Sequence, residues 1–331
     1  MKLTTPLYSL SCAFALIMTA CVGSSEQPAT NHHVPTADKL VRGEYLAHSV
    51  AICVDCHSDR DFSRFAGPPV RGTAGKGGAP FTREMGIPGT VFARNITPAA
   101  LGTFSDEQIL RAMTAGVGPR GDALFPLMPY LQLRKMCRSD LEAILAWLRA
   151  LEPIDFTVPP RALDIPWDAP AGPTGTFALR EDCPDRKDTI AYGQYLLESA
   201  SCHDCHTVQD ANGPVPGRML AGGFDFDVSV LGMHVTSANI TPDVDTGIGA
   251  WSRERFIGRF KAFADADSLP KLDPGDGQTI MPWTSYAGMS EEDLGAIYDY
   301  LRTVPPVKNA VTRFRDGPGD QTAALTAGST D

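Results

Sequence analysis

The chain has 331 residues, 43% hydrophobic and 21% charged, an ordinary globular composition that excludes collagen-like, coiled-coil and wholly disordered chains. Its 39 acidic and 29 basic residues give a formal charge of -10, so we expect no nucleic-acid partner, because contacts to phosphates need clustered Lys and Arg. The length suggests about two domains. The 31 glycines and 27 prolines indicate long loops between the elements.

The N-terminal segment predicts export. A short positive start precedes a mostly apolar run over residues 7–20, which is too short for a transmembrane helix, so we interpret residues 1–20 as a signal peptide. Cys21 follows Met-Thr-Ala, a pattern similar to bacterial lipoprotein signals. We therefore predict lipidation of Cys21, residues 21–37 as a flexible tether, and a periplasmic protein anchored to a bacterial membrane by its lipid. The alternative is an ordinary cleavable signal with Cys21 merely nearby.

An internal repeat organises the remainder. Residues 42–57 and 192–206 share a Gly, Tyr, Leu pattern that leads into CxxCH, and Asn-Ile-Thr-Pro, Met-Pro and a final helical pattern then recur in the same order. Such ordered similarity indicates duplication. The sequence predicts two homologous domains, 38–152 and 188–307, a Pro-rich linker over 153–187 and a disordered tail over 308–331. No segment after the signal reaches about 18 consecutive apolar residues, so we expect no further membrane span.

Each predicted domain contains three helices, and the fold class is therefore mainly α. The first helix covers about 38–48 or 188–199, the second begins after Ser105 or Ser252, and the third begins near Ser139 or Ser290. Glu142 and Asp293 stand at the capping-box position of the third helix. We interpret the glycine-rich segments 67–91 and 213–235 as loops or short hairpins, and the repeated Asn-Ile-Thr-Pro as a tight turn.

Gly43 and Gly193 recur on the first helix of each domain, next to Tyr45 and Tyr195. A residue without a side chain lets two backbones approach closely. We therefore expect the first and third helices of each domain to cross at these glycines.

The CxxCH motifs carry the chemistry. Cys53, Cys56 and His57 form the first motif, and Cys202, Cys205 and His206 form the second. Cysteines three residues apart on one turn can form two thioether links to a porphyrin, and the next histidine can bind its iron, so we predict two covalently bound haem c groups. The alternatives are zinc, which would need more Cys or His near each motif, and a thioredoxin-like pair, which needs no histidine.

A sixth iron ligand distinguishes electron transfer from chemistry at the metal. Met128 lies 71 residues after His57 and Met281 lies 75 residues after His206, each followed by proline. We predict that these two thioethers complete the coordination of each iron. Met136 and Met289 are the competing pair, but they stand just ahead of the third helix, where an apolar residue commonly packs onto the first turn.

Two further cysteines remain open between two interpretations. Cys137 and Cys183 would form a disulfide in an oxidising periplasm. Two free thiols are the alternative, because the sequence does not show how far apart they lie.

These motifs resemble the multihaem c-type cytochrome subunits of bacterial membrane-bound alcohol and gluconate dehydrogenases. The resemblance covers about residues 39–307 and includes CxxCH, a Gly-Gly loop (77–78 and 222–223), Asn-Ile-Thr-Pro and a Met-Pro loop, with Tyr286 matching the pattern after Met281 and Leu133 departing from it. It implies two tandem class I-like cytochrome c domains. Those subunits generally carry three haems and a C-terminal membrane segment, whereas this chain has two CxxCH motifs.

The predicted function is to carry single electrons between redox partners, without catalysis, and one form of this role is the electron outlet of a dehydrogenase. The alternatives are a dihaem peroxidase, which needs one iron with an open sixth position, and a thiosulfate-oxidising enzyme, for which Cys137 is the candidate distal ligand. Residues 38–152 hold 14 basic and 12 acidic side chains, whereas residues 188–304 hold 7 and 17. The second domain is therefore expected to dock on a basic partner.

Overall fold

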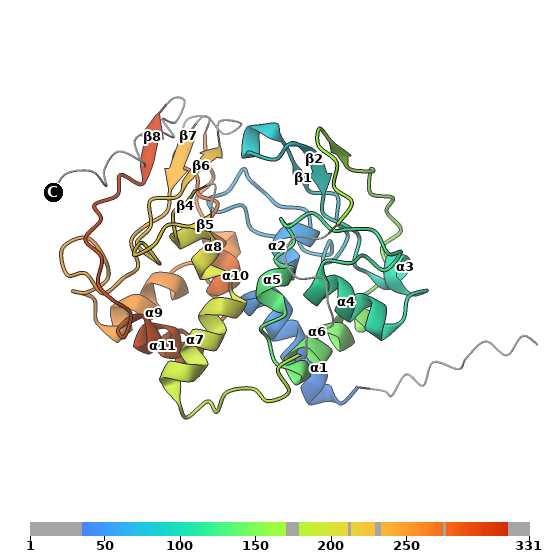
Figure 1. The fold of residues 1–331 in the computed structure, drawn as a ribbon, viewed down its shortest axis with the longest axis horizontal. Coiled ribbons are helices and arrows are strands. Elements are labelled where there is room, and N and C mark those ends of the chain that lie inside the picture. Colours follow the sequence, from blue (N-terminus) through green and yellow to red (C-terminus); the bar gives the residue numbers. More distant parts are fainter. Residues whose placement is uncertain (1–34, 170–178, 211–212, 229–232, 274–275, 317–331) are drawn as a thin grey trace, which may run out of the picture. The chain divides into compact units, whose positions relative to one another are not determined.

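The computed structural model describes residues 35–169, 179–210, 213–228, 233–273 and 276–316 (Figure 1). The predicted signal peptide, Cys21 and all but the last residues of the predicted tether lie outside this part of the chain. Within the described ranges, no helix combines the length and the apolar character needed to cross a bilayer.

Helices dominate the first half, drawn in blue to green in Figure 1. Its elements are α1 (Ala37–Tyr45), the π-helix η1 (Leu46–Val50), α2 (Cys53–His57), β1 (Pro80–Phe81), the 3-10 turn η2 (Arg83–Met85), β2 (Gly89–Phe92), α3 (Pro98–Leu101), α4 (Asp106–Ala115), α5 (Tyr130–Leu133), α6 (Arg138–Ala150) and β3 (Ala162–Leu163).

The second half repeats this order. Its elements are α7 (Thr189–Ser199), α8 (Cys202–His206), β4 (Gln209–Asp210), β5 (Gly213–Pro214), β6 (Asp225–Val228), β7 (Met233–Thr236), α9 (Arg253–Lys261), the 3-10 turn η4 (Ala266–Ser268), α10 (Trp283–Tyr286), α11 (Glu291–Leu301) and β8 (Phe314–Asp316). The equivalent pairs are α1 and α7, α2 and α8, α4 and α9, α5 and α10, and α6 and α11. The described secondary structure is therefore mainly helical, as predicted.

The second and third helices begin largely where the sequence indicated. Ser105, Ser252 and Ser290 are N-caps whose side chains accept backbone N–H groups of α4, α9 and α11. The third helix of the first half also begins near Ser139, as predicted, but Ser139 is not its cap, because α6 begins at Arg138 after the N-cap Cys137. The first N–H group of α6, that of Arg138, donates to the carbonyl of Arg180 (2.8 Å), so this end is satisfied by a neighbouring segment rather than by a serine cap.

The predicted capping-box carboxylates have other partners. Glu142 forms an ion pair with Lys39 (3.1 Å), and the carboxylate of Asp293 accepts a hydrogen bond from the hydroxyl of Tyr45 (2.6 Å). Both carboxylates therefore connect helices instead of closing the end of their own helix.

The expected glycine crossings are confirmed. A Cβ atom at Gly43 would overlap the carbonyl oxygen of Ala143 on α6, and a Cβ atom at Gly193 would overlap that of Ala296 on α11. The first and third helices of each half therefore pack backbone against backbone, an approach that only glycine permits.

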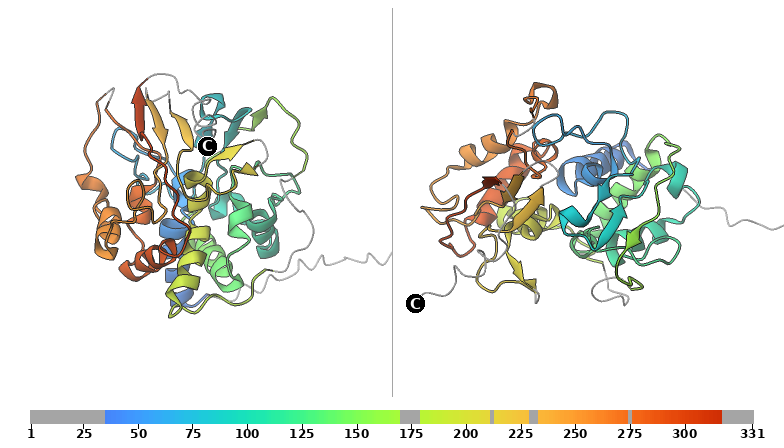
Figure 2. Two further views of the ribbon diagram at one scale, coloured as in Figure 1. Left: turned by 60° about the vertical axis from the view of Figure 1, so that its left-hand side comes forward. Right: turned by 90° about the horizontal axis from the view of Figure 1, so that it is seen from above.

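The glycine-rich segments form short antiparallel hairpins, β1–β2 and β6–β7. A strand from beyond each third helix extends each hairpin: β3 pairs with β2, and β8 pairs with β7, as Figure 2 also shows for β8 in red beside the orange hairpin. The prediction of disorder from residue 308 is therefore wrong for residues 308–316, and residues 317–331 lie outside the described part. Both returning strands begin in segments that the sequence marks as linker or tail.

The two halves share one hydrophobic core, which contains buried side chains from both, including Leu46, Leu141, Leu196 and Leu294. Cys137 and Cys183 form a disulfide, with their Cα atoms 5.1 Å apart, that joins the start of α6 to the segment before α7. The halves therefore share apolar contacts, and the disulfide ties the first half to the segment that leads into the second.

Candidate metal centres

The two CxxCH motifs form short, equivalent helices, α2 and α8. The residue ahead of each, Ile52 or Ser201, has a left-handed backbone conformation (φ 46° and 54°) that separates the motif from the preceding helix. All four cysteines of the motifs are half-buried and outside any disulfide. Burial raises the pKa of these thiols to about 12 for Cys53, Cys202 and Cys205 and to about 11 for Cys56, so each is a neutral thiol near pH 7.

Each motif histidine is oriented by one backbone carbonyl. Nδ1 of His57 lies 2.6 Å from the carbonyl oxygen of Arg94, and Nδ1 of His206 lies 2.7 Å from that of Ala238. Because a carbonyl only accepts, Nδ1 must donate, and the lone pair of Nε2 is left for a metal. Burial lowers the pKa of both imidazoles, which favours the neutral form that metals bind.

The first glycine of each Gly-Gly loop packs against the carbonyl of Arg94 or Ala238 and bonds to the backbone of the motif histidine. The N–H groups of Gly77 and Gly222 donate to the carbonyls of His57 (2.9 Å) and His206 (2.8 Å). Both glycines have positive φ values, +74° and +67°, and a Cβ atom on either would overlap the carbonyl of Arg94 or Ala238. The same glycine thus contacts the histidine backbone and leaves room for the carbonyl that orients its ring.

The Asn-Ile-Thr-Pro turn directly follows each of these carbonyls. Oδ1 of Asn95 accepts from the backbone N–H (2.9 Å) and the hydroxyl (2.8 Å) of Thr97, and its amide donates to the carbonyl of Ile154 (2.8 Å). Asn239 makes the equivalent bonds to Thr241 and Val307. The predicted tight turn is confirmed. The carbonyls of Arg94 and Ala238 were not predicted, although each stands one residue ahead of a repeated motif.

The Met-Pro loops are equally alike. Pro129 (φ -80°, ψ 48°) and Pro282 (φ -79°, ψ 63°) have the backbone angles of inverse γ-turns. Each turn is closed by a 2.8 Å hydrogen bond from the residue after proline to the methionine carbonyl. Met128 and Met281 are half-buried against the core, whereas Met136 and Met289 are 0% and 1% exposed. The competing methionines therefore occupy the core ahead of their helices, as expected from the sequence.

The donor set fits haem c better than zinc. Each motif offers two thiols one turn apart and an imidazole whose Nε2 is free for iron. Among the described residues, the only cluster of three potential zinc ligands is Cys137, Asp140 and Cys183, which includes no residue of either motif, and its two cysteines are joined in the disulfide.

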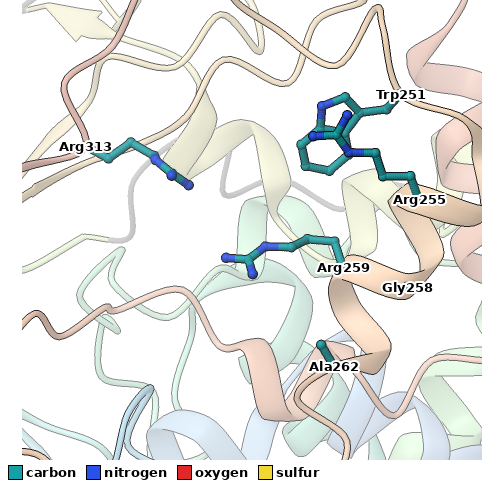
Figure 3. A pocket seen from close by; sticks show the side chains of 6 residues that line it. All are labelled: Trp251, Arg255, Gly258, Arg259, Ala262 and Arg313. Atoms are coloured by element: carbon teal, nitrogen blue, oxygen red, sulfur yellow. The ribbon is translucent and has the colours of Figure 1, made fainter.

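A separate cavity of about 480 Å³ lies beside α9 and is lined by Trp251, Arg255, Gly258, Arg259, Ala262 and Arg313. Figure 3 shows the guanidinium groups of Arg259 and Arg313 extending toward each other. Arg259 also stacks on Trp283, two residues after Met281 (4.7 Å). This basic pocket contrasts with the acidic composition of the second half and has the chemistry to hold an oxyanion.

The chain is similar to the cytochrome c subunit of gluconate 2-dehydrogenase from Pantoea cypripedii, with 28% identity over 81% of the chain and 60% of that protein. It is 25% identical to the cytochrome c subunit of a quinone-dependent alcohol dehydrogenase from Gluconobacter oxydans, over 89% of the chain and 61% of that protein. A diheme cytochrome c-type protein from Cereibacter sphaeroides is 26% identical over 77% of the chain and 83% of its own length.

These comparisons confirm the resemblance predicted from the motifs. The chain spans about 60% of the length of the two dehydrogenase subunits and most of the length of the diheme protein. No family model matches the sequence.

Proposed function

We propose that this chain, a relative of the cytochrome c subunits of bacterial dehydrogenases, is a periplasmic dihaem cytochrome c that passes single electrons between redox partners. The observation that carries the proposal is the repeated site. In both halves, a CxxCH helix, an imidazole fixed through Nδ1 and a turn at Met-Pro occur together. We assign His57 and Met128 to the first iron, and His206 and Met281 to the second.

The haems, when bound, supply the one-electron change between ferric and ferrous iron. The protein orients each imidazole through a backbone carbonyl. The two cysteines of each motif would hold the porphyrin, and the methionine of each proline-stiffened loop would supply a thioether to the iron. A soft thioether favours ferrous iron and raises the potential. These roles need neither a proton donor nor an open coordination site, so we propose electron transfer rather than catalysis.

Carbon monoxide tests the assignment. The holoprotein is fully reduced and its visible spectrum is recorded before and after adding the gas, which binds only an iron whose sixth site is free or weakly held. We expect no change in the unaltered protein, and binding at one haem in Met281→Ala. Stoichiometric binding by the unaltered protein would favour the peroxidase-type alternative, and peroxide turnover would then be assayed. A spectrum without covalently bound haem would overturn the proposal.

The partners follow from the relatives and from charge. We propose that the chain is the electron outlet of a dehydrogenase and docks through the acidic surface of its second half. Glu291 and Glu292 are exposed at the start of α11. Replacing both with Gln should slow electron exchange with a cationic redox reagent at low salt and not at high salt. Arg255→Gln is the matched control and should not slow that reaction. Equal rates in all proteins would count against acidic docking.

Attachment to the membrane is a further part of the proposal. Cys21 would carry the lipid, so Cys21→Ser should move the protein from the membrane fraction to the soluble periplasmic fraction. A variant that stays membrane-bound would contradict the anchor and leave the haem assignment untouched.

A further inference from the structure

The middle residues of the two CxxCH motifs make contacts that the proposed function does not use. Asp55 and Asp204 are equivalent positions on α2 and α8, two residues before the motif histidines. Ser285 and Gln132 are also equivalent, since each stands four residues after its Met-Pro methionine, on α10 and α5. The duplication therefore pairs one acid and one hydrogen-bond donor in each half.

These residues bond across the halves, not within them. The hydroxyl of Ser285 donates to Oδ1 of Asp55, and Nε2 of Gln132 donates to Oδ1 of Asp204 (2.8 Å). Each attachment helix is thus tied to the methionine loop of the other half. Because the same exchange occurs in both directions, it follows the repeat itself and is not an isolated surface contact.

The hydrogen bond between Ser285 and Asp55 is buried, so its loss would be costly. Asp55 is 5% exposed and Ser285 is 7% exposed, and a buried carboxylate must keep its hydrogen-bond donors to remain favourable. Asp55 has a second donor within its own half, Nη1 of Arg60 (2.7 Å). The position of Asp55 relative to the first motif is therefore fixed by one bond from each half.

Helix α10 also contacts the segment just before the other attachment motif. The hydroxyl of Tyr286, which follows Ser285, donates to the carbonyl of Ala200 (2.6 Å), two residues before Cys202. The short helix that follows the Met281 loop thus touches the segments around both CxxCH motifs. A displacement of α10 would therefore change the contacts of both motif segments.

We propose that Asp55 and Asp204 are positioning residues that lock each haem-attachment helix to the methionine loop of the opposite half, so that the potential of each haem depends on a residue of the other half. The inference rests on the proposed function. A haem potential responds to the placement of neighbouring charge and to hydrogen bonding around the site. A substitution in one half should therefore change the reduction potential of the haem in the other half.

A redox titration of the holoprotein, followed by its visible spectrum, tests this. Met128→His identifies the wave of the first haem, because it replaces the ligand assigned to that iron. Ser285→Ala, in the second half, should shift this first wave, and Ser285→Thr, which keeps a hydroxyl, should restore it. The matched control is Thr284→Ala, whose hydroxyl lies on the same helix and has no hydrogen-bond partner in the described part. The control should leave the first wave unchanged.

The outcomes separate the two proposals. If the titration shows two waves and Ser285→Ala shifts neither, the proposed coupling between the halves is wrong, but the proposed function stands. If the unaltered protein shows no such waves, the proposed function fails and this inference fails with it. Should Ser285→Ala not fold, Gln132→Ala tests the reciprocal bond, with an expected shift of the second wave and not only of the first. An unmoved second wave there would equally contradict the proposal.

Discussion

At the residue scale, the orientation of each imidazole depends on a glycine. Gly77 and Gly222 lie against the carbonyls that accept from His57 and His206, and a Cβ atom on either glycine would overlap those carbonyls. Both have positive φ. Replacing either glycine therefore has two costs, the strain of a side chain at positive φ and the overlap with the carbonyl. Other glycines of the chain have positive φ without such an overlap, so the two costs can be measured separately.

We predict that Gly77→Ala and Gly222→Ala each destabilise the protein by about 3 kcal/mol and disturb the histidine. Gly72→Ala and Gly217→Ala are matched controls, since those glycines have φ values of +78° and +73° and nothing within 4 Å of a Cβ atom. The controls should cost about 1 kcal/mol, from backbone conformation alone. Denaturant unfolding gives the stabilities and the visible spectrum reports the ligand. Equal losses in all four variants would exclude the steric role of Gly77 and Gly222.

A second residue makes stability depend on pH. His48 packs edge-on against Trp147, with ring centroids 5.2 Å apart, and burial lowers its pKa below the ordinary 6.5. The unfolded chain therefore takes up a proton on His48 before the folded protein does, so stability is lost as the pH falls through about 6.5. We expect the free energy of unfolding to fall less between about pH 7.5 and about pH 5.5 in His48→Asn than in the unaltered protein. Parallel losses in urea unfolding at the two pH values would contradict this.

At the scale of the element, the sequence predicted most helices because their signals are local. Ser105, Ser252 and Ser290 cap the helices they were expected to cap. The cap of α6 could not be predicted in this way, because the first N–H group of the helix donates to the carbonyl of Arg180, which lies 42 residues further along the chain. Strands β3 and β8 escaped prediction for a similar reason. They are two and three residues long and pair through backbone groups, which leave no pattern in the side chains.

The disulfide between α6 and the segment before α7 stabilises the packing of these two elements. Cys137 and Cys183 are 46 residues apart in sequence, and closing a loop of that size restricts the unfolded chain. We predict that Cys183→Ser lowers the free energy of unfolding by about 3 kcal/mol. Dithiothreitol should lower the stability of the unaltered protein similarly and leave Cys183→Ser unchanged, because the proposed thioether links to haem would resist reduction by thiols. A dithiothreitol-insensitive stability would mean that the two thiols are free.

At the scale of the whole molecule, the duplication was predictable and the exchange between the repeats was not. The sequence identified the equivalent Tyr45 and Tyr195 on the first helices and Asp293 on the third helix of the second half, but not Asp140. Hydrophobic periodicity gives the same pattern whether such helices meet within one half or across two. In the structure, Tyr45 donates to Asp293, 248 residues away (2.6 Å), and Tyr195 donates to Asp140 (2.7 Å). Only the folded arrangement distinguishes this crossing from contacts within each half.

The two tyrosine–aspartate bonds between the halves differ in whether the carboxylate keeps another partner once the tyrosine hydroxyl is removed. Asp140 also accepts from Nε and Nη2 of Arg42 (2.9 and 2.7 Å), so Tyr195→Phe leaves its carboxylate paired and should cost about 1 kcal/mol. Asp293 is 2% exposed, and Tyr45 is its side-chain donor from the other half. Tyr45→Phe should therefore cost about 2 to 3 kcal/mol, because a buried carboxylate then loses that partner.

Urea unfolding measures this difference, with Tyr300→Phe as the control for loss of a tyrosine hydroxyl, since the Tyr300 side chain lies partly exposed on α11 and should lose almost nothing. A larger loss for Tyr45→Phe than for Tyr195→Phe means that the bond to Asp293 helps to hold the halves together. Equal losses would mean that the apolar core joins the halves and the tyrosines merely fill it. Because the packing of the halves sets the distance between the two proposed haem sites, the first result would also make that packing part of the proposed function.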